Sequence, residues 1–155
     1  MDDSFRMFLE SVDVMDQKPI LEIHEFLAQN NCKCEVKSAK SGYVISYLLS
    51  NPKRTLANFV CRKNGVKIRV YANNVGKYQN LLNTFPDKIK KEIIKASVCK
   101  RLINPDDCNP RCSMGYTFIL DGVECKKCRY MAFMPTVKED SLTYIMQMLE
   151  NEINA

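Results

Sequence analysis

The chain has 155 residues, of which 46% are hydrophobic and 26% charged, and its formal net charge is +5. A chain of this length can bury a core without disulfide bonds, and the composition excludes a disordered or low-complexity protein. We therefore expect one domain over residues 1–155. No apolar run is long enough to cross a membrane, and the acidic start Met1-Asp2-Asp3 lacks the basic end of a signal peptide. These features indicate a cytoplasmic protein that contacts no membrane and keeps its thiols reduced.

The charge is unevenly distributed along the chain. Residues 1–31 carry a net charge of −5, residues 32–101 one of +13, and residues 102–155 one of −3. A basic segment of this kind attracts phosphates and other anions, and salt weakens the attraction. The simpler interpretation is a solvated basic surface that the acidic first helices partly neutralise.

The first elements alternate between helical and strand patterns. Apolar residues recur at helical spacing over residues 4–12 and 17–29, which predicts two helices. The second helix carries His24, the only histidine, beside its apolar stripe, where a packing role is more typical than metal binding. Cys32 and Cys34 then alternate with charged residues, as in a half-buried strand. We expect buried thiols there, with a redox or metal-ligand pair as the alternative.

A predicted antiparallel sheet follows. It comprises a turn at Ser41-Gly42, a strand over residues 43–49 and a hairpin over residues 56–72. Asn64-Gly65 is the favoured type I′ turn, and a two-residue loop there places Arg62 opposite Lys67. Like charges in that position would cost about a few tenths of a kcal/mol.

The alternation of side chains divides this hairpin into two faces. The apolar face, which we expect in the core, comprises Ala57, Phe59, Cys61, Val66, Ile68, Val70 and Ala72. The opposite face carries Asn58, Val60, Arg62, Lys67, Arg69 and Tyr71. Three basic residues beside an aromatic ring make it a candidate site for an anionic partner, of which nucleic acid is one class. Plain solvation is the simpler alternative.

The second half of the chain mixes helices with a loop-rich segment. The patterns predict a helical stretch over residues 74–84, a helix from Pro86 to Ser97, a loop over 99–115, a hairpin turning at Asp121-Gly122, a strand over 128–134 and a helix over 141–154. Helices that follow and precede an antiparallel sheet in this way indicate an α+β fold.

Four cysteines form the clearest motif. Cys108 and Cys112 are followed, after twelve residues, by Cys125 and Cys128. Two close cysteine pairs separated by a hairpin are typical of structural zinc sites, because each pair supplies two thiolates from a tight loop. We therefore expect an antiparallel sheet packed by helices, with a C-terminal Cys-rich hairpin stapled by Zn²⁺. Four protein ligands leave the metal no open position, so the zinc would be structural rather than catalytic.

Two alternatives to this assignment stay open. Cys99 can take the place of Cys125 in the ligand set, and an iron–sulfur cluster is the other metal that cysteines of this kind bind. Zinc held by four thiolates has a formal charge of −2, which the neighbouring bases can compensate: Lys100, Arg101, Arg111, Lys126, Lys127 and Arg129.

Motifs for nucleotide binding and for familiar catalytic sites are missing. The sequence has no P-loop, no G-x-G-x-x-G, no H-E-x-x-H and no G-x-S-x-G. We therefore expect a non-enzymatic binding or regulatory module. The alternatives are a protein that binds a small ligand or handles metal, and a thiol redox enzyme or sensor that uses Cys32, Cys34 or Cys99. The sequence does not indicate an oligomeric state.

Residues 4–98 follow the layout helix, strand, strand, hairpin, helix, with Gly42-Tyr43-Val44-Ile45 in one strand and a hairpin from Lys63 to Tyr71. In these features the stretch resembles the small bacterial YdhG-type domains, a frataxin-like family of the iron-chaperone type. The resemblance implies a compact antiparallel sheet packed on one side by helices. The Cys-rich region, residues 99–134, lies outside it, so no functional residue is carried over. The segment Asn104 to Cys112 (Asn-Pro-x-x-Cys-Asn-Pro-x-Cys) is similar to one in other small bacterial proteins and implies no activity.

Overall fold

The computed structural model describes residues 1–40 and 42–155 and confirms the predicted α+β class. In chain order the elements are α1 (Asp3–Ser11), α2 (Val14–Gln29), β1 (Lys33–Ala39), β2 (Gly42–Ser50), β3 (Lys53–Arg62), β4 (Gly65–Val70), the 3-10 turns η1 (Val75–Lys77) and η2 (Gln79–Thr84), α3 (Asp87–Lys95), α4 (Lys100–Ile103), β5 (Tyr116–Leu120), β6 (Val123–Lys127) and α5 (Leu142–Ile153). The predicted turn at Ser41-Gly42 includes Ser41, which lies outside the described residues.

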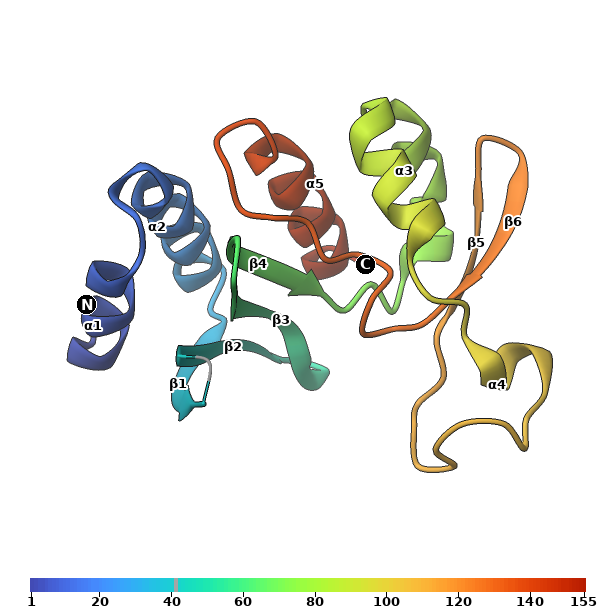
Figure 1. The fold of residues 1–155 in the computed structure, drawn as a ribbon, viewed down its shortest axis with the longest axis horizontal. Helices are drawn as coiled ribbons and strands as arrows, with labels where there is room; N and C mark the ends of the chain where they lie inside the picture. The colour runs from blue at the N-terminus through green and yellow to red at the C-terminus, as the bar shows by residue number, and fades with distance from the viewer. Residues whose placement is uncertain (41) are drawn as a thin grey trace.

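The helices α1, α2, α3 and α5 lie on one side of a four-stranded antiparallel sheet of order β1-β2-β3-β4, whereas α4 lies apart from them, as Figure 1 shows. Asp2 and Asp13 begin the first two helices, because their carboxylates accept hydrogen bonds from backbone N–H groups in the first turn. Phe5 and Phe8 of α1 are fully buried against the sheet's core face. The helices that the structure describes do not combine the length and apolar character that a membrane span requires.

The β3–β4 hairpin has a different register from the predicted one. Arg62 pairs with Gly65 and Lys67 pairs with Val60, so the loop is Lys63-Asn64. Gly65 has a φ of +125°, a conformation that glycine adopts easily, and it returns the chain to the ladder directly after the turn. The difference is two residues along β4, so every side chain keeps its predicted face. The expected repulsion between Arg62 and Lys67 in opposite positions was therefore wrong.

The free edge of β4 is paired by a segment from the far end of the chain. Ile68 and Val70 donate backbone hydrogen bonds to the carbonyls of Pro135 (3.1 Å) and Phe133 (2.9 Å), and Val137 donates to Val66 (2.8 Å). The strand predicted over residues 128–134 was wrong, because residues 129–131 form a turn and only the part after Ala132 runs beside β4. Pro135 cannot donate a ladder hydrogen bond, which limits regular strand structure there.

The second hairpin, β5–β6, has the predicted two-residue turn. Leu120 pairs with Val123, and both turn residues, Asp121 and Gly122, have positive φ, as a type I′ turn requires. On the other side of β6, Val98 forms a bridge with Lys127. The hairpin is therefore anchored to the chain that leaves α3, and the predicted loop over 99–115 contains the short helix α4 within it.

Glu152 of α5 ties the C-terminal helix to the sheet through buried hydrogen bonds. Its side chain is 0% exposed and lies 2.5 Å from the guanidinium of Arg54, which is 15% exposed. The carboxylate also accepts from the Asn74 backbone N–H (3.1 Å), from the Asn74 amide (3.2 Å) and from the Tyr78 hydroxyl. Burial and the nearby carboxylate raise the pKa of Tyr78, so the hydroxyl stays protonated and donates a hydrogen bond to Glu152.

Candidate functional site

The face of the sheet turned away from the helices carries the predicted anion-binding residues. Arg62, Lys67, Arg69 and Tyr71 come from β3, β4 and the residue after β4, and all four retain solvent exposure. The apolar residues of the same hairpin point to the opposite, helix-covered face, where Phe59, Ile68 and Val70 are fully buried. In Figure 1 no helix lies against the outward face of these strands.

Arg69 and Tyr71 do not stand alone, because two residues from the Cys-rich region join them. The Arg69 Nε donates to the Tyr130 carbonyl at 2.8 Å, and its guanidinium lies 5.8 Å from the Tyr130 ring. Tyr71 and Tyr130 meet edge to face at 6.1 Å, and the Arg129 guanidinium lies 5.6 Å from the Tyr71 ring. The result is a cluster in which two cations flank a pair of rings, in the order Arg69, Tyr130, Tyr71 and Arg129, which we call the arginine–tyrosine cluster.

This cluster presents both charge and flat aromatic surface to solvent. Tyr130 is 43% exposed. Two hydrogen bonds fix the Arg129 guanidinium, which donates to the Met114 carbonyl (3.2 Å) and to the Asn73 side chain (3.0 Å). Sequence reasoning missed Arg129 and Tyr130 as parts of this face, because only the tertiary structure brings residues 129–130 to β4.

The rest of the outward face mixes apolar and polar residues. Val44 and Val60 are paired beside Lys67, and Val60 is buried. Ser46, Asn58 and Arg69 are aligned across β2, β3 and β4. The Asn58 amide donates weakly to the Ser46 hydroxyl (3.4 Å), and its Oδ1 is buried without a hydrogen-bond partner among the described residues. The row ends at Glu35 on β1, an acid whose carboxylate lies 3.6 Å from the Lys33 ammonium. Lys33 and Lys37 flank Glu35 on the same face of β1, so lysines also lie at this edge, while the arginines of the face lie at the β3–β4 side.

Cys99 and Cys128 lie on two antiparallel segments beside the β5–β6 hairpin. The Cys99 N–H donates to the Lys126 carbonyl at 3.0 Å, and the Cys128 N–H donates to the Ser97 carbonyl at 2.7 Å. The Cys99 side chain is buried, and its Sγ accepts a hydrogen bond from the Gly115 N–H at 3.2 Å. Such N–H donors are the groups that stabilise a negatively charged sulfur.

Cys108 and Cys112 lie in the loop after α4. Cys108 is exposed with a φ of +77°, and Cys112 is half-buried. The Arg101 guanidinium donates to the Cys112 carbonyl, while its buried Nε has no hydrogen-bond partner among the described residues. A buried donor without a partner beside a cysteine loop is chemically suited to a thiolate acceptor.

Cys125 has a different environment from the other predicted ligands. It lies in β6 opposite Phe118, is 5% exposed and belongs to the hydrophobic core. Burial raises the pKa of its thiol, which disfavours the thiolate that a metal needs. Across residues 1–40 and 42–155, no three side chains of His, Cys, Asp or Glu are arranged to hold a metal ion.

His24 and the strand cysteines form a separate cluster beneath α1. The His24 ring stacks on Phe5 at 3.7 Å, and its Nδ1 lies 2.7 Å from the Tyr47 hydroxyl. Burial lowers the pKa of His24 and raises the pKa of the Cys32 and Cys34 thiols. Neutral thiols are weak nucleophiles, so this cluster has the chemistry of packing rather than of a reactive thiol site.

The basic residues near the cysteines have different tasks. The Lys127 ammonium is buried and donates to the carbonyls of Ile94 (2.6 Å) and Ala96 (3.0 Å), where it caps the end of α3. Lys126 pairs with Glu124 at 3.8 Å. Arg101, another of the bases expected to compensate a metal charge, donates a hydrogen bond to the Cys112 carbonyl.

Comparison with known proteins adds no relative. The sequence matches no family model, no curated protein and no solved structure. The resemblance of residues 4–98 to YdhG-type domains therefore stays a prediction.

Proposed function

We propose that this protein is a binding module for single-stranded nucleic acid, which it contacts through the outward face of β3 and β4 and the arginine–tyrosine cluster. The observation that carries the proposal is a pair of solvent-accessible tyrosine rings flanked by two guanidinium groups, beside a sheet face that no helix covers. Guanidinium groups pair with phosphates, and exposed rings stack on unpaired bases of any sequence. Duplex nucleic acid keeps its bases stacked, so the rings favour a single strand.

The electrostatics support the same conclusion. Arg62, Lys67, Arg69 and Arg129 contribute four positive charges to this side of the sheet, whereas Glu35, the acid of the outward face, lies at the opposite edge on β1. Phosphate binding by such a surface releases counterions, so the affinity falls steeply as salt rises.

The second part of the proposal is a structural metal, with Zn²⁺ held by Cys99, Cys108, Cys112 and Cys128. The donor groups fit this assignment, because the Gly115 N–H already points to the Cys99 sulfur and the Arg101 Nε is free to serve a thiolate. Cys125 fits less well, since its side chain is part of the core. Binding requires the loop of residues 104–113 to bring Cys108 and Cys112 to the other two cysteines.

The metal would serve the binding face. Cys128 directly precedes Arg129 and Tyr130, and the Met114 carbonyl that accepts from Arg129 lies two residues after Cys112. Fixing both segments would hold the Arg129 guanidinium and the Tyr130 ring in position, which lowers the entropy lost on binding.

For the binding face, we expect Arg62→Gln/Arg69→Gln to weaken binding to a labelled oligothymidylate and to reduce the slope of log K against log salt by about 1.4, roughly 0.7 for each phosphate contact with a single strand. Fluorescence anisotropy over a salt series measures both. The control, Lys18→Gln/Lys91→Gln, removes the same charge from exposed sites on α2 and α3 and should keep the slope. If neither single-stranded DNA nor RNA is retained at low salt, the proposed function is wrong.

For the metal, we expect about one zinc per chain in the purified protein and no visible absorption band. Cys99→Ser and Cys128→Ser should each lose the zinc, whereas Cys125→Ala should keep it. Elemental analysis and an absorption spectrum on the same sample decide between the assignments. If Cys125→Ala loses the zinc and Cys99→Ser keeps it, the ligands are instead Cys108, Cys112, Cys125 and Cys128. Iron with a brown charge-transfer band would instead indicate an iron–sulfur cluster.

A further inference from the structure

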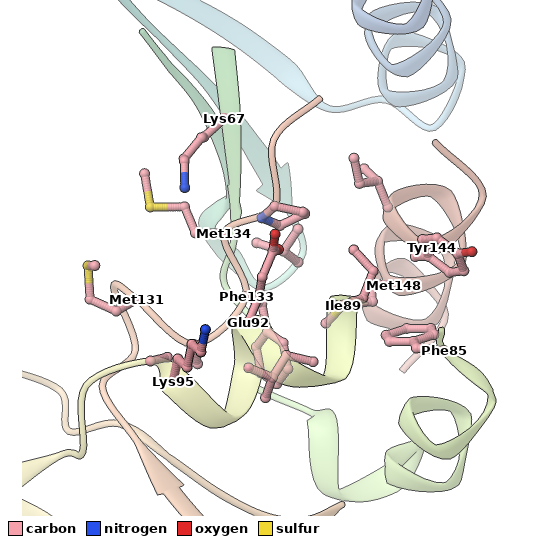
Figure 2. A pocket seen from close by; sticks show the side chains of 16 residues that line it. Lys67, Phe85, Ile89, Glu92, Lys95, Met131, Phe133, Met134, Tyr144 and Met148 are labelled. Carbon is pink, nitrogen blue, oxygen red and sulfur yellow. The ribbon is translucent and has the colours of Figure 1, made fainter. Parts of the chain in front are cut away.

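A cavity of about 250 Å³ lies between α3, α5 and the segment that pairs with β4. It adjoins the arginine–tyrosine cluster, since the Arg69 guanidinium lies 3.8 Å from the sulfur of the lining residue Met134. Figure 2 shows its lining side chains. The apolar part is formed by aromatic, aliphatic and methionine side chains, among them Phe85, Ile89, Phe133, Tyr144 and Met148. A dry apolar cavity of about 150 Å³ already holds benzene, so this one has room for a larger hydrocarbon group.

The charged groups lie on one side of the cavity. In Figure 2 Lys67 and Lys95 lie on the same side as Met131 and Met134, and Tyr144, Met148 and Phe85 lie on the other. Met131 is 47% exposed, whereas Phe85 and Met148 are 4% and 5% exposed. The lysine side is therefore the open end, and the aromatic side is the deep end.

The two ammonium groups are available to a ligand. Neither Lys67 nor Lys95 is in a salt bridge within residues 1–40 and 42–155. They come from different elements, β4 and the last turn of α3, and flank the same opening. Glu92 is the acid among the lining residues, which leaves a net positive charge at the entrance.

We propose that this cavity binds a small apolar monoanion, whose hydrocarbon body enters between α3 and α5 and whose carboxylate lies between Lys67 and Lys95. Pockets for such ligands are predominantly apolar and use a few polar groups to orient the bound molecule. Methionines are flexible and polarisable, so Met131, Met134 and Met148 can adapt to different ring shapes. Lys67 belongs to both proposed sites, whereas Lys95 on α3 lies outside the binding face, so a change at Lys95 tests the cavity without altering that face.

The test uses 2-naphthoate, with the neutral 2-naphthamide as its matched analogue, on the full chain labelled with ¹³C at its methionine methyl groups. We expect 2-naphthoate to shift the signals of Met131, Met134 and Met148 and to leave those of Met7 and Met15, which are exposed on α1 and α2, unchanged. We expect the naphthamide to bind about five- to tenfold more weakly, because partly exposed charge pairs contribute modestly.

The variants separate the charge from the cavity. Lys95→Met should remove about three- to fivefold of the preference for the anion, Glu92→Gln should increase that preference, and Lys91→Met on the same helix should change neither. Ala132→Leu extends a buried lining residue into the cavity and should weaken both ligands equally. Equal affinity for naphthoate and naphthamide, or shifts at Met7 and Met15 instead of the lining methionines, would overturn the proposal. So would an absence of binding at millimolar 2-naphthoate.

Discussion

Glu152→Gln should lower the free energy of unfolding by about 3–5 kcal/mol, the cost of removing one partner from a buried ion pair. The carboxylate accepts hydrogen bonds from Arg54, Asn74 and Tyr78, and its side chain is fully buried. The neutral amide of Glu152→Gln would leave the Arg54 charge uncompensated. Its NH₂ group would also face the donors of Arg54, Asn74 or Tyr78, where the carboxylate offers an acceptor. Urea unfolding followed by circular dichroism measures the change.

Glu150→Gln is the matched control for this prediction. Glu150 is an exposed residue on the same helix, so the same chemical change should alter stability by less than about 0.5 kcal/mol. Tyr78→Phe removes one donor without leaving a buried charge and should have an intermediate effect. A Glu152→Gln protein as stable as the Glu150→Gln protein would show that the buried network contributes nothing to holding α5.

Gly115→Ala should be the most damaging single-methyl change in the Cys-rich region. A Cβ at this position would overlap the Lys127 carbonyl and lie 2.8 Å from the Cys99 Cβ. Backbone cannot yield as a flexible side chain does, so residues 114–115 would have to separate from β6 and Cys99. We expect a loss of about 3 kcal/mol or more, at the upper end of the cost of overpacking. Thermal unfolding and the rate of thiol modification at Cys99 both report it.

Gly76→Ala provides the comparison for Gly115→Ala. No atom lies within 4 Å of a Cβ built at Gly76, and its φ is not positive. This variant should be neutral or slightly stabilising, because alanine restricts the unfolded chain. If both alanine variants unfold at the same temperature, the close contact between Gly115, Cys99 and β6 does not exist in solution.

Sequence patterns predict elements well where the information is local. The alternation in β3 and β4 assigns each residue to the correct face, and the Asp121-Gly122 turn has the predicted length. The β3–β4 register was wrong because either Asn64-Gly65 or Lys63-Asn64 can occupy the turn, and the choice depends on where glycine adopts positive φ. The strand over residues 128–134 was wrong because its apolar residues are buried by contacts across the chain rather than by a regular strand.

The candidate site is only partly accessible to such reasoning. Arg62, Lys67, Arg69 and Tyr71 follow from alternation within one hairpin. Their neighbours Arg129 and Tyr130 directly follow Cys128. In the sequence this position suggests only that Arg129 compensates the negative charge of a metal–thiolate site. Their position beside β4 depends on long-range pairing, which spacing in the sequence does not encode. The choice between Cys99 and Cys125 has the same origin, because the core contact of Cys125 with Phe118 exists only in the folded hairpin.

The pairing of β4 with residues 133–137 has a consequence for the order in which the protein is made. The backbone N–H groups of Ile68 and Val70, at the edge of β4, bond to carbonyls of Pro135 and Phe133. The ribosome adds these two residues more than sixty residues later. Until then the emerging chain presents an open strand edge, the feature that most readily recruits a second chain. Synthesis of this small protein therefore passes through an interval in which its amino-terminal half is complete in sequence and still vulnerable to aggregation. The C-terminal third ends that interval when its backbone covers the edge.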